Sequence, residues 1–199
     1  MRISALPPPA LQIIRAEHNA LAAMLRSLAM MIERGPDAEP ARYFEVLRSM
    51  LFYVDEFPER LHHPKESNHL FPRVARAAPE MAAVIAQLEA DHGSGEQRVR
   101  ELQHLLTAWE LLGDARREAF AAAGRDYVRF HLEHIRTEET ELLPVAAQRL
   151  SPEDWQELAA IFEASPDPLA TGRAPDPSYD RLFSRIVATA PAPIGVGAA

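Results

Sequence analysis

Apolar residues near the N-terminus recur at alternating steps of three and four. This spacing places their side chains on one face of an α-helix, as in a helix that packs inside a bundle. The residues of this stripe are Leu11, Ile14, Leu21, Leu25, Leu28 and Ile32. His18 occupies the one stripe position where an apolar residue is missing. The spacing therefore predicts a helix that ends near Gly35-Pro36 and turns a histidine toward the core.

Three further stretches show the same spacing: one from Pro40 past Val54, one from Ile85 to Leu106, and one from Phe120 to Val145. Glycine is scarce between the ends of the chain, while alanine and leucine are abundant, which favours helix throughout. Four amphipathic helices with short connections predict an all-α protein, an up-down-up-down four-helix bundle.

The bundle is expected to occupy residues 1–150 of the 199-residue chain. Residues 151–199 are expected to form a short extra C-terminal helix, capped by Ser151, and a Pro-rich tail. Within the tail, residues 179–187 have the pattern of a short amphipathic helix. The tail is expected to cover either the bundle or a partner subunit, and a homodimer is therefore one of the expected assemblies.

Prolines interrupt the second helix close to its histidines. Pro58 and Pro64 each lack the backbone N–H that an α-helix uses, and each tends to kink a helix. We therefore expect this helix to be bent or briefly broken there. In the third helix, Gly93 and Gly95 flank His92. Glycine is unfavourable inside a helix, so these two either leave room for a bulky group or allow close helix packing.

Every expected helix carries a polar residue on its inward stripe. Two of them carry a His-x-x-x-Glu pair, in which both side chains lie on one helix face. The six residues are His18, His62, Glu66, His92, His134 and Glu138. A single inward histidine is typical of a hydrogen-bonded core residue, but four contributing helices favour a metal site. The chain has no cysteine, so the ligands must be nitrogen and oxygen atoms, which suit iron, manganese or zinc.

These motifs resemble the haemerythrin-like HHE cation-binding family over about residues 10–150. The resemblance is carried by Glu17-His18-Asn19, His62-His63-Pro64-Lys65-Glu66, Asp91-His92-Gly93 and His134-Ile135-Arg136-Thr137-Glu138, with Leu70-Phe71-Pro72 and Leu142-Leu143-Pro144 after the glutamates. It implies a non-haem di-iron centre with two iron ions inside the bundle. Glu66 and Glu138 would bridge the irons, and His18, His62, His92 and His134 would be terminal ligands.

The ligand count departs from that of the oxygen-carrying members, which have five histidines, two of them on the third helix. Here Glu96 stands four residues after His92. His131, on the same stripe as His134, is the favoured fifth histidine, either as a ligand or as an outer hydrogen-bond donor. The further candidates are His63, which is rotated about 100° from His62 unless Pro64 re-aims it, and His69, for which a packing or surface role is favoured.

An additional carboxylate at the irons would favour ferric iron and oppose reversible oxygenation. The favoured function is binding or sensing of a small diatomic ligand, oxygen or nitric oxide, or the handling of iron. Two alternatives stay open. The first is a di-iron enzyme, namely an oxidase, a peroxidase or a nitric-oxide-linked repair protein. The second is an interaction scaffold that holds zinc or no metal.

Charge and hydropathy limit the partners. The net charge is −8 and no strong basic patch is present, so nucleic acid is not an expected partner. No apolar run reaches the ~18 residues that a membrane-spanning helix needs. The N-terminus lacks the apolar core of a signal peptide, and we expect a cytoplasmic protein.

Overall fold

The computed structural model describes residues 6–36, 38–172 and 179–197. Almost all of these residues are helical, which confirms the all-α prediction. Within the described ranges, extended pairing is limited to one isolated bridge between Pro191 and Gly197. None of the helices described is both long enough and apolar enough to cross a membrane.

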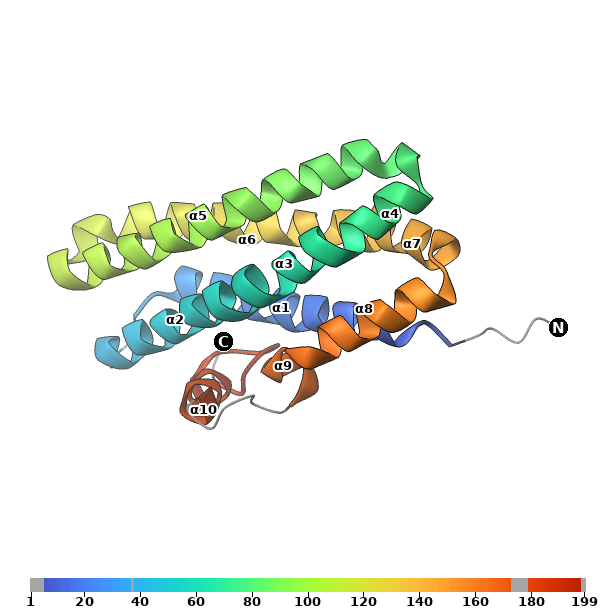
Figure 1. The fold of residues 1–199 in the computed structure, drawn as a ribbon. Helices are drawn as coiled ribbons and strands as arrows, with labels where there is room; N and C mark the ends of the chain where they lie inside the picture. Colours follow the sequence, from blue (N-terminus) through green and yellow to red (C-terminus); the bar gives the residue numbers. More distant parts are fainter. Residues whose placement is uncertain (1–5, 37, 173–178, 198–199) are drawn as a thin grey trace.

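Four long helical segments lie side by side (Figure 1). They are α1 (Pro9–Arg34), a second segment from Pro40 to Ala77, α5 (Ala82–Leu112), and a fourth segment from Arg117 to Arg149. The connections between them are short and include 3₁₀ turns at Pro79–Met81 and Asp114–Arg116. The four stretches with three-and-four spacing correspond to these four segments.

The second segment stays helical through its prolines. It consists of α2 (Pro40–Val54), a π-helical stretch (Asp55–His62), α3 (His63–Lys65), a second π-helical stretch (Glu66–Leu70) and α4 (Phe71–Ala77). The N–H of His63 bonds to the carbonyl oxygen of Pro58, five residues earlier. Of the two expected forms, a bend or a brief break, the break is absent, because wider turns with bonds over five residues accommodate the prolines.

The fourth segment contains a matching π-helical stretch. It consists of α6 (Arg117–Thr137), the π-helical stretch (Glu138–Leu142) and α7 (Leu143–Arg149). The stretches at Glu66 and Glu138 both begin at the glutamate of a His-x-x-x-Glu pair, and in both a proline follows six residues later. Such a proline cannot donate the α-helical bond at its position, so the wider turn falls at the same place in both segments.

The apolar core is divided into two clusters with a polar layer between them. Along α1, Ile14 belongs to one cluster and Leu21 to the other, and His18 lies between them. Along α5, Leu88 and Val99 are divided in the same way. The polar residues of the inward stripes therefore form a layer enclosed by apolar packing at both ends.

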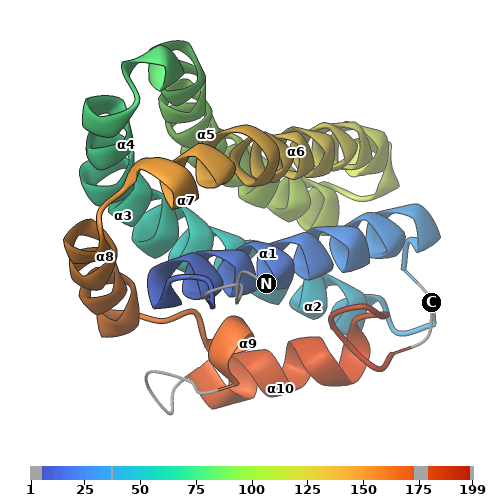
Figure 2. The ribbon, with the colours of Figure 1, turned by 90° about the vertical axis from the view of Figure 1, so that its right-hand side faces the viewer.

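The C-terminal helices pack onto the outside of this arrangement (Figures 1 and 2). Helix α8 (Pro152–Ala164) lies along α1 and begins with a capping box, in which the Ser151 side chain accepts a hydrogen bond from the backbone N–H of Asp154. The short α9 (Pro168–Thr171) follows, and α10 (Asp180–Thr189) packs against α2. The predicted cap is confirmed, and the predicted amphipathic helix at 179–187 corresponds to α10. The parts of the tail at 173–178 and 198–199 lie outside the described residues.

Candidate metal centre

The six residues chosen from the stripes come together in the polar layer. They form two overlapping groups, in each of which one ligand atom per residue lies within 4.8 Å of all the others. One group is His18, His62, Glu66 and Glu138, and the other is Glu66, His92, His134 and Glu138. The two glutamates are therefore common to both groups, while the histidines divide between them.

Glu66 is oriented toward both groups at once. Its Oε1 lies 3.2 Å from His62 Nε2 and 3.6 Å from His18 Nε2. Its Oε2 lies 3.6 Å from His92 Nε2. The two oxygens of one carboxylate thus face two different sets of imidazoles, which is the arrangement needed to bridge two metal ions.

Glu138 also contacts both groups. Its Oε2 lies 3.0 Å from His18 Nε2 and 3.7 Å from His134 Nε2. Glu66 and Glu138 are both fully buried. Two buried carboxylates at one site are costly unless cations neutralise them, so this geometry favours a positively charged occupant.

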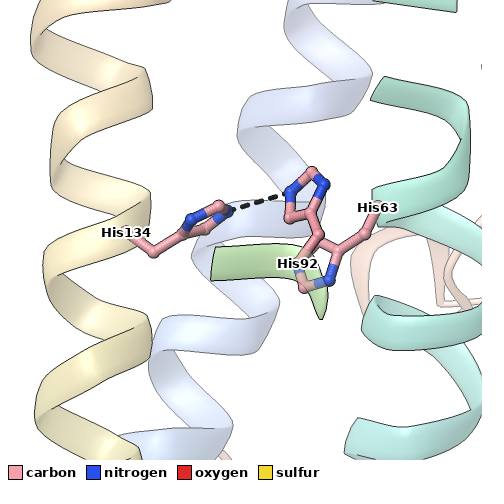
Figure 3. Close-up of side chains that lie close together, drawn as sticks. All are labelled: His63, His92 and His134. Carbon is pink, nitrogen blue, oxygen red and sulfur yellow. Dashed lines mark hydrogen bonds between the residues drawn. The ribbon is translucent and has the colours of Figure 1, made fainter. Parts of the chain in front are cut away.

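A fifth histidine lies beside the second group. His63, His92 and His134 have ligand nitrogens within 4.8 Å of one another, and His92 Nε2 is 3.2 Å from His134 Nε2 (Figure 3). Of the two leading candidates for a fifth histidine, the structure brings His63 to the cluster, while His131 lies further out. The π-helical stretch at Asp55–His62 gives fewer degrees of rotation per residue than an α-helix, and both His62 and His63 are buried.

The other candidates lie outside the two groups. His131 is buried, but its Nε2 lies 3.2 Å from Glu59 Oε1, away from the shared carboxylates. Glu96 is exposed and pairs with Arg100, so the expected extra carboxylate is not at the cluster. His69 is half-buried and belongs to none of the candidate groups found among the described residues.

Outer hydrogen bonds orient all five imidazoles in the same sense. In each ring Nδ1 faces a partner outside the cluster, which leaves Nε2 available as a ligand atom. The pairs are His18–Glu139 (2.9 Å), His62–Glu17 (2.7 Å), His63–Glu59 (3.1 Å), His92–Ser67 (2.9 Å) and His134–Asp91 (3.5 Å). Our sequence reasoning missed these partners. Their place in the sequence could have identified them. Glu17, Asp91 and Glu139 each stand next to a cluster residue, and Glu59 stands four residues before His63.

The inward-facing atoms fit a metal ion. Both oxygens of Glu66 and of Glu138 are buried without a hydrogen-bond partner, and so are the Nε2 atoms of His18 and His62. Buried polar atoms are normally satisfied, and leaving them unsatisfied is destabilising. Metal coordination would satisfy all of them, and the donor set of imidazole and carboxylate suits iron, zinc or manganese.

The two histidine groups differ in protonation when no ion is bound. Burial alone would lower the pKa of His62, but Glu66 outweighs this effect and raises the pKa to about 9. Burial alone would also lower the pKa of His18, but nearby carboxylates, among them Glu138 with its Oε2 3.0 Å from His18 Nε2, raise it well above the usual value. Burial lowers the pKa of His63 to about 4. A metal ion must therefore displace protons from His18 and His62, and binding is expected to release protons near neutral pH.

The fold and this cluster define a helical protein with a buried cation-binding site. The family model of the Hemerythrin HHE cation binding domain matches residues 10–146, well over half of the chain. The chain therefore belongs to this family, as the sequence motifs indicated. No curated protein matches the chain.

A second buried network connects the cluster to the C-terminal helices. The Tyr53 hydroxyl donates to Asp167 Oδ2 at 2.5 Å, and the Asp167 backbone N–H donates to Glu17 Oε1 at 3.1 Å. Glu17 in turn bonds to His62. Burial raises the pKa of Asp167 to about 6, although the hydrogen bond from Tyr53 opposes the shift.

We expect Asp167→Asn to stabilise the metal-free protein above pH 6 and to have little effect near pH 4. The folded-state pKa lies above the usual value of 3.8, so the folded state binds the proton more tightly and loses stability as pH rises from about 4 to 6. Two pKa units correspond to about 3 kcal/mol at most. Urea unfolding at pH 4 and pH 8 measures the difference. Equal effects at both pH values would contradict the assignment.

Proposed function

We propose that the four long segments form an up-down-up-down four-helix bundle holding two iron ions. Glu66 and Glu138 would be shared by the two ions, His18 and His62 would hold one of them, and His63, His92 and His134 would hold the other. The observation that carries this proposal is the orientation of Glu66, whose two oxygens face different histidine groups. We place the boundary of this metal-binding unit near residue 150, with residues 151–199 packed against it.

The unequal number of imidazoles suggests where a small ligand binds. The position with His18 and His62 has one protein donor fewer than the position with three histidines. A metal position with fewer protein ligands keeps a site open for an exogenous molecule.

We infer that the bound irons serve to bind or sense a diatomic molecule, oxygen or nitric oxide. Reduced iron supplies the electrons that such ligands need for tight binding. The chain's own residues hold the irons, exclude water and keep the imidazoles oriented through their Nδ1 partners. The exposure of Glu96 and the position of His63 beside His92 and His134 support oxygen binding, because they argue against an extra carboxylate at the irons.

The test is the metal content and the visible spectrum of protein purified without added metal, reduced, and then exposed to oxygen or nitric oxide. We expect about two irons per chain and a new absorption band with either ligand. His134→Ala should lower the iron content, whereas His104→Ala, which changes an exposed histidine, should not. Zinc in the purified protein, together with failure to take up iron, would overturn the proposal. Sustained consumption of oxygen with a reductant would reassign the protein as an enzyme.

A further inference from the structure

A second polar cluster lies directly behind His63. Glu59 is buried, and its Oε2 accepts a hydrogen bond from His63 Nδ1 at 3.1 Å. Its Oε1 accepts a hydrogen bond from the Tyr127 hydroxyl at 3.2 Å and lies 3.2 Å from His131 Nε2. One carboxylate on the second helical segment is thus held by two side chains of α6, and it holds His63.

The charge on Glu59 fixes which nitrogen of His63 carries the proton. A carboxylate only accepts hydrogen bonds, so a neutral His63 keeps its proton on Nδ1 and presents the lone pair of Nε2 to the cluster. Tyr127 and His131 lie 3.2 Å from the other oxygen of Glu59 and hold the carboxylate against His63 Nδ1. Glu59 thereby selects the tautomer of His63 that can bind a metal.

Gly95 provides the space in which this carboxylate lies. A Cβ atom at Gly95 would come within 2.8 Å of Glu59 Oε1, 3.0 Å of Glu59 Oε2 and 3.0 Å of His131 Cε1. Gly95 is buried inside α5, where glycine costs about 1 kcal/mol relative to alanine. A Cβ atom at Gly93, two residues earlier on the same helix, would meet nothing within 4 Å. The room left by Gly95 is therefore specific to Glu59 and His131.

We propose that Glu59, held by Tyr127 and His131 in the space left by Gly95, is the positioning residue that makes His63 a metal ligand. It thereby controls occupancy of the metal position formed by His63, His92 and His134. Glu59 touches no metal in this scheme and acts through His63 alone. The inference rests on the proposed two-metal function, and it assigns to Glu59 the selective support of one of the two positions.

The test compares Gly95→Ala with Gly93→Ala in anaerobic titrations of the full chain with ferrous iron, and separately with zinc as a redox-silent probe. Both substitutions change a helical glycine to alanine. We expect Gly93→Ala to bind two ions as the unchanged protein does. Gly95→Ala should bind one ion normally and the other, at the position of His63, His92 and His134, about 10- to 100-fold more weakly, the usual effect of removing an outer partner of a ligand.

Glu59→Gln keeps the size of the side chain and decides the question if Gly95→Ala fails to fold. It removes the carboxylate that selects the His63 tautomer, and it should likewise weaken binding of only one of the two ions. Equal weakening of both ions would indicate a general structural role and overturn the inference. So would two ions bound with unchanged affinities in these variants. If the unchanged protein binds fewer than two ions, the proposed function itself fails, which separates the two claims.

Discussion

Removal of the bound metal is expected to lower the midpoint of thermal unfolding by about 15 to 30 °C. An ion that binds only the folded state stabilises it by about 4 kcal/mol when its free concentration is about 1,000 times Kd. Two ions together contribute about 8 kcal/mol, and each kcal/mol shifts the midpoint by about 2–4 °C for a chain of this size. Scanning calorimetry before and after chelation measures the shift.

The expected loss of stability is large because removing the ions leaves buried polar atoms without partners. Without them, the oxygens of Glu66 and Glu138 lie buried without hydrogen-bond partners. The matched control is the double substitution Glu66→Gln and Glu138→Gln, which keeps side-chain size but removes both buried charges. We expect no shift on chelation in this variant, and a midpoint at or above that of the metal-free unchanged protein. An unchanged midpoint on chelation of protein that held two irons would place those irons elsewhere.

The residues of the candidate metal groups on the inward stripes could be picked out from sequence because they obey the α-helical period. His18 occupies a stripe position, and His62 with Glu66 stands four residues apart on one face. These relations survive in the structure, since all three lie in one candidate group. The apolar residues and the histidines therefore follow the same α-helical period, because both lie on the inward face of each helix.

The position of His63 could not be predicted from that period. Rotation of about 100° per residue turns His63 away from His62, but the π-helical stretch before it has wider turns. Pro58 and Pro64 signalled that the α-helical bonding must change, without specifying how. The sequence suggested a bend or a break, and the structure keeps the helix continuous while re-aiming one side chain.

Glu96 was a candidate because of its spacing from His92 alone, and the structure places it away from the cluster. Glu96 stands four residues after His92, but the inward stripe continues through Gly95 and Val99, which are both buried. Glu96 is therefore one position out of register, and it is exposed. The gap at Gly95 is filled from another helix by Glu59, a tertiary relation that no spacing within α5 encodes.

Phe162→Ala is expected to lower the free energy of unfolding by about 3–5 kcal/mol, the usual range for truncating a buried phenylalanine. Phe162 lies in α8, beyond the residues matched by the family, and is fully buried. Its ring centroid is 6.0 Å from that of His62, and the Lys65 ammonium lies 5.3 Å from the ring. The C-terminal part of the chain therefore packs directly against a candidate metal ligand.

Because of this contact, Phe162→Ala should also weaken binding of the ion at the His18–His62 position. Leu158→Ala is the matched control, since Leu158 is fully buried in α8 within the same apolar cluster as Phe162. It should cost about 2–5 kcal/mol of stability and leave both ion affinities unchanged. Urea unfolding gives the stabilities, and zinc titration gives the affinities. Equal loss of affinity in both variants would show that α8 supports the bundle as a whole, with no specific support of His62 by Phe162.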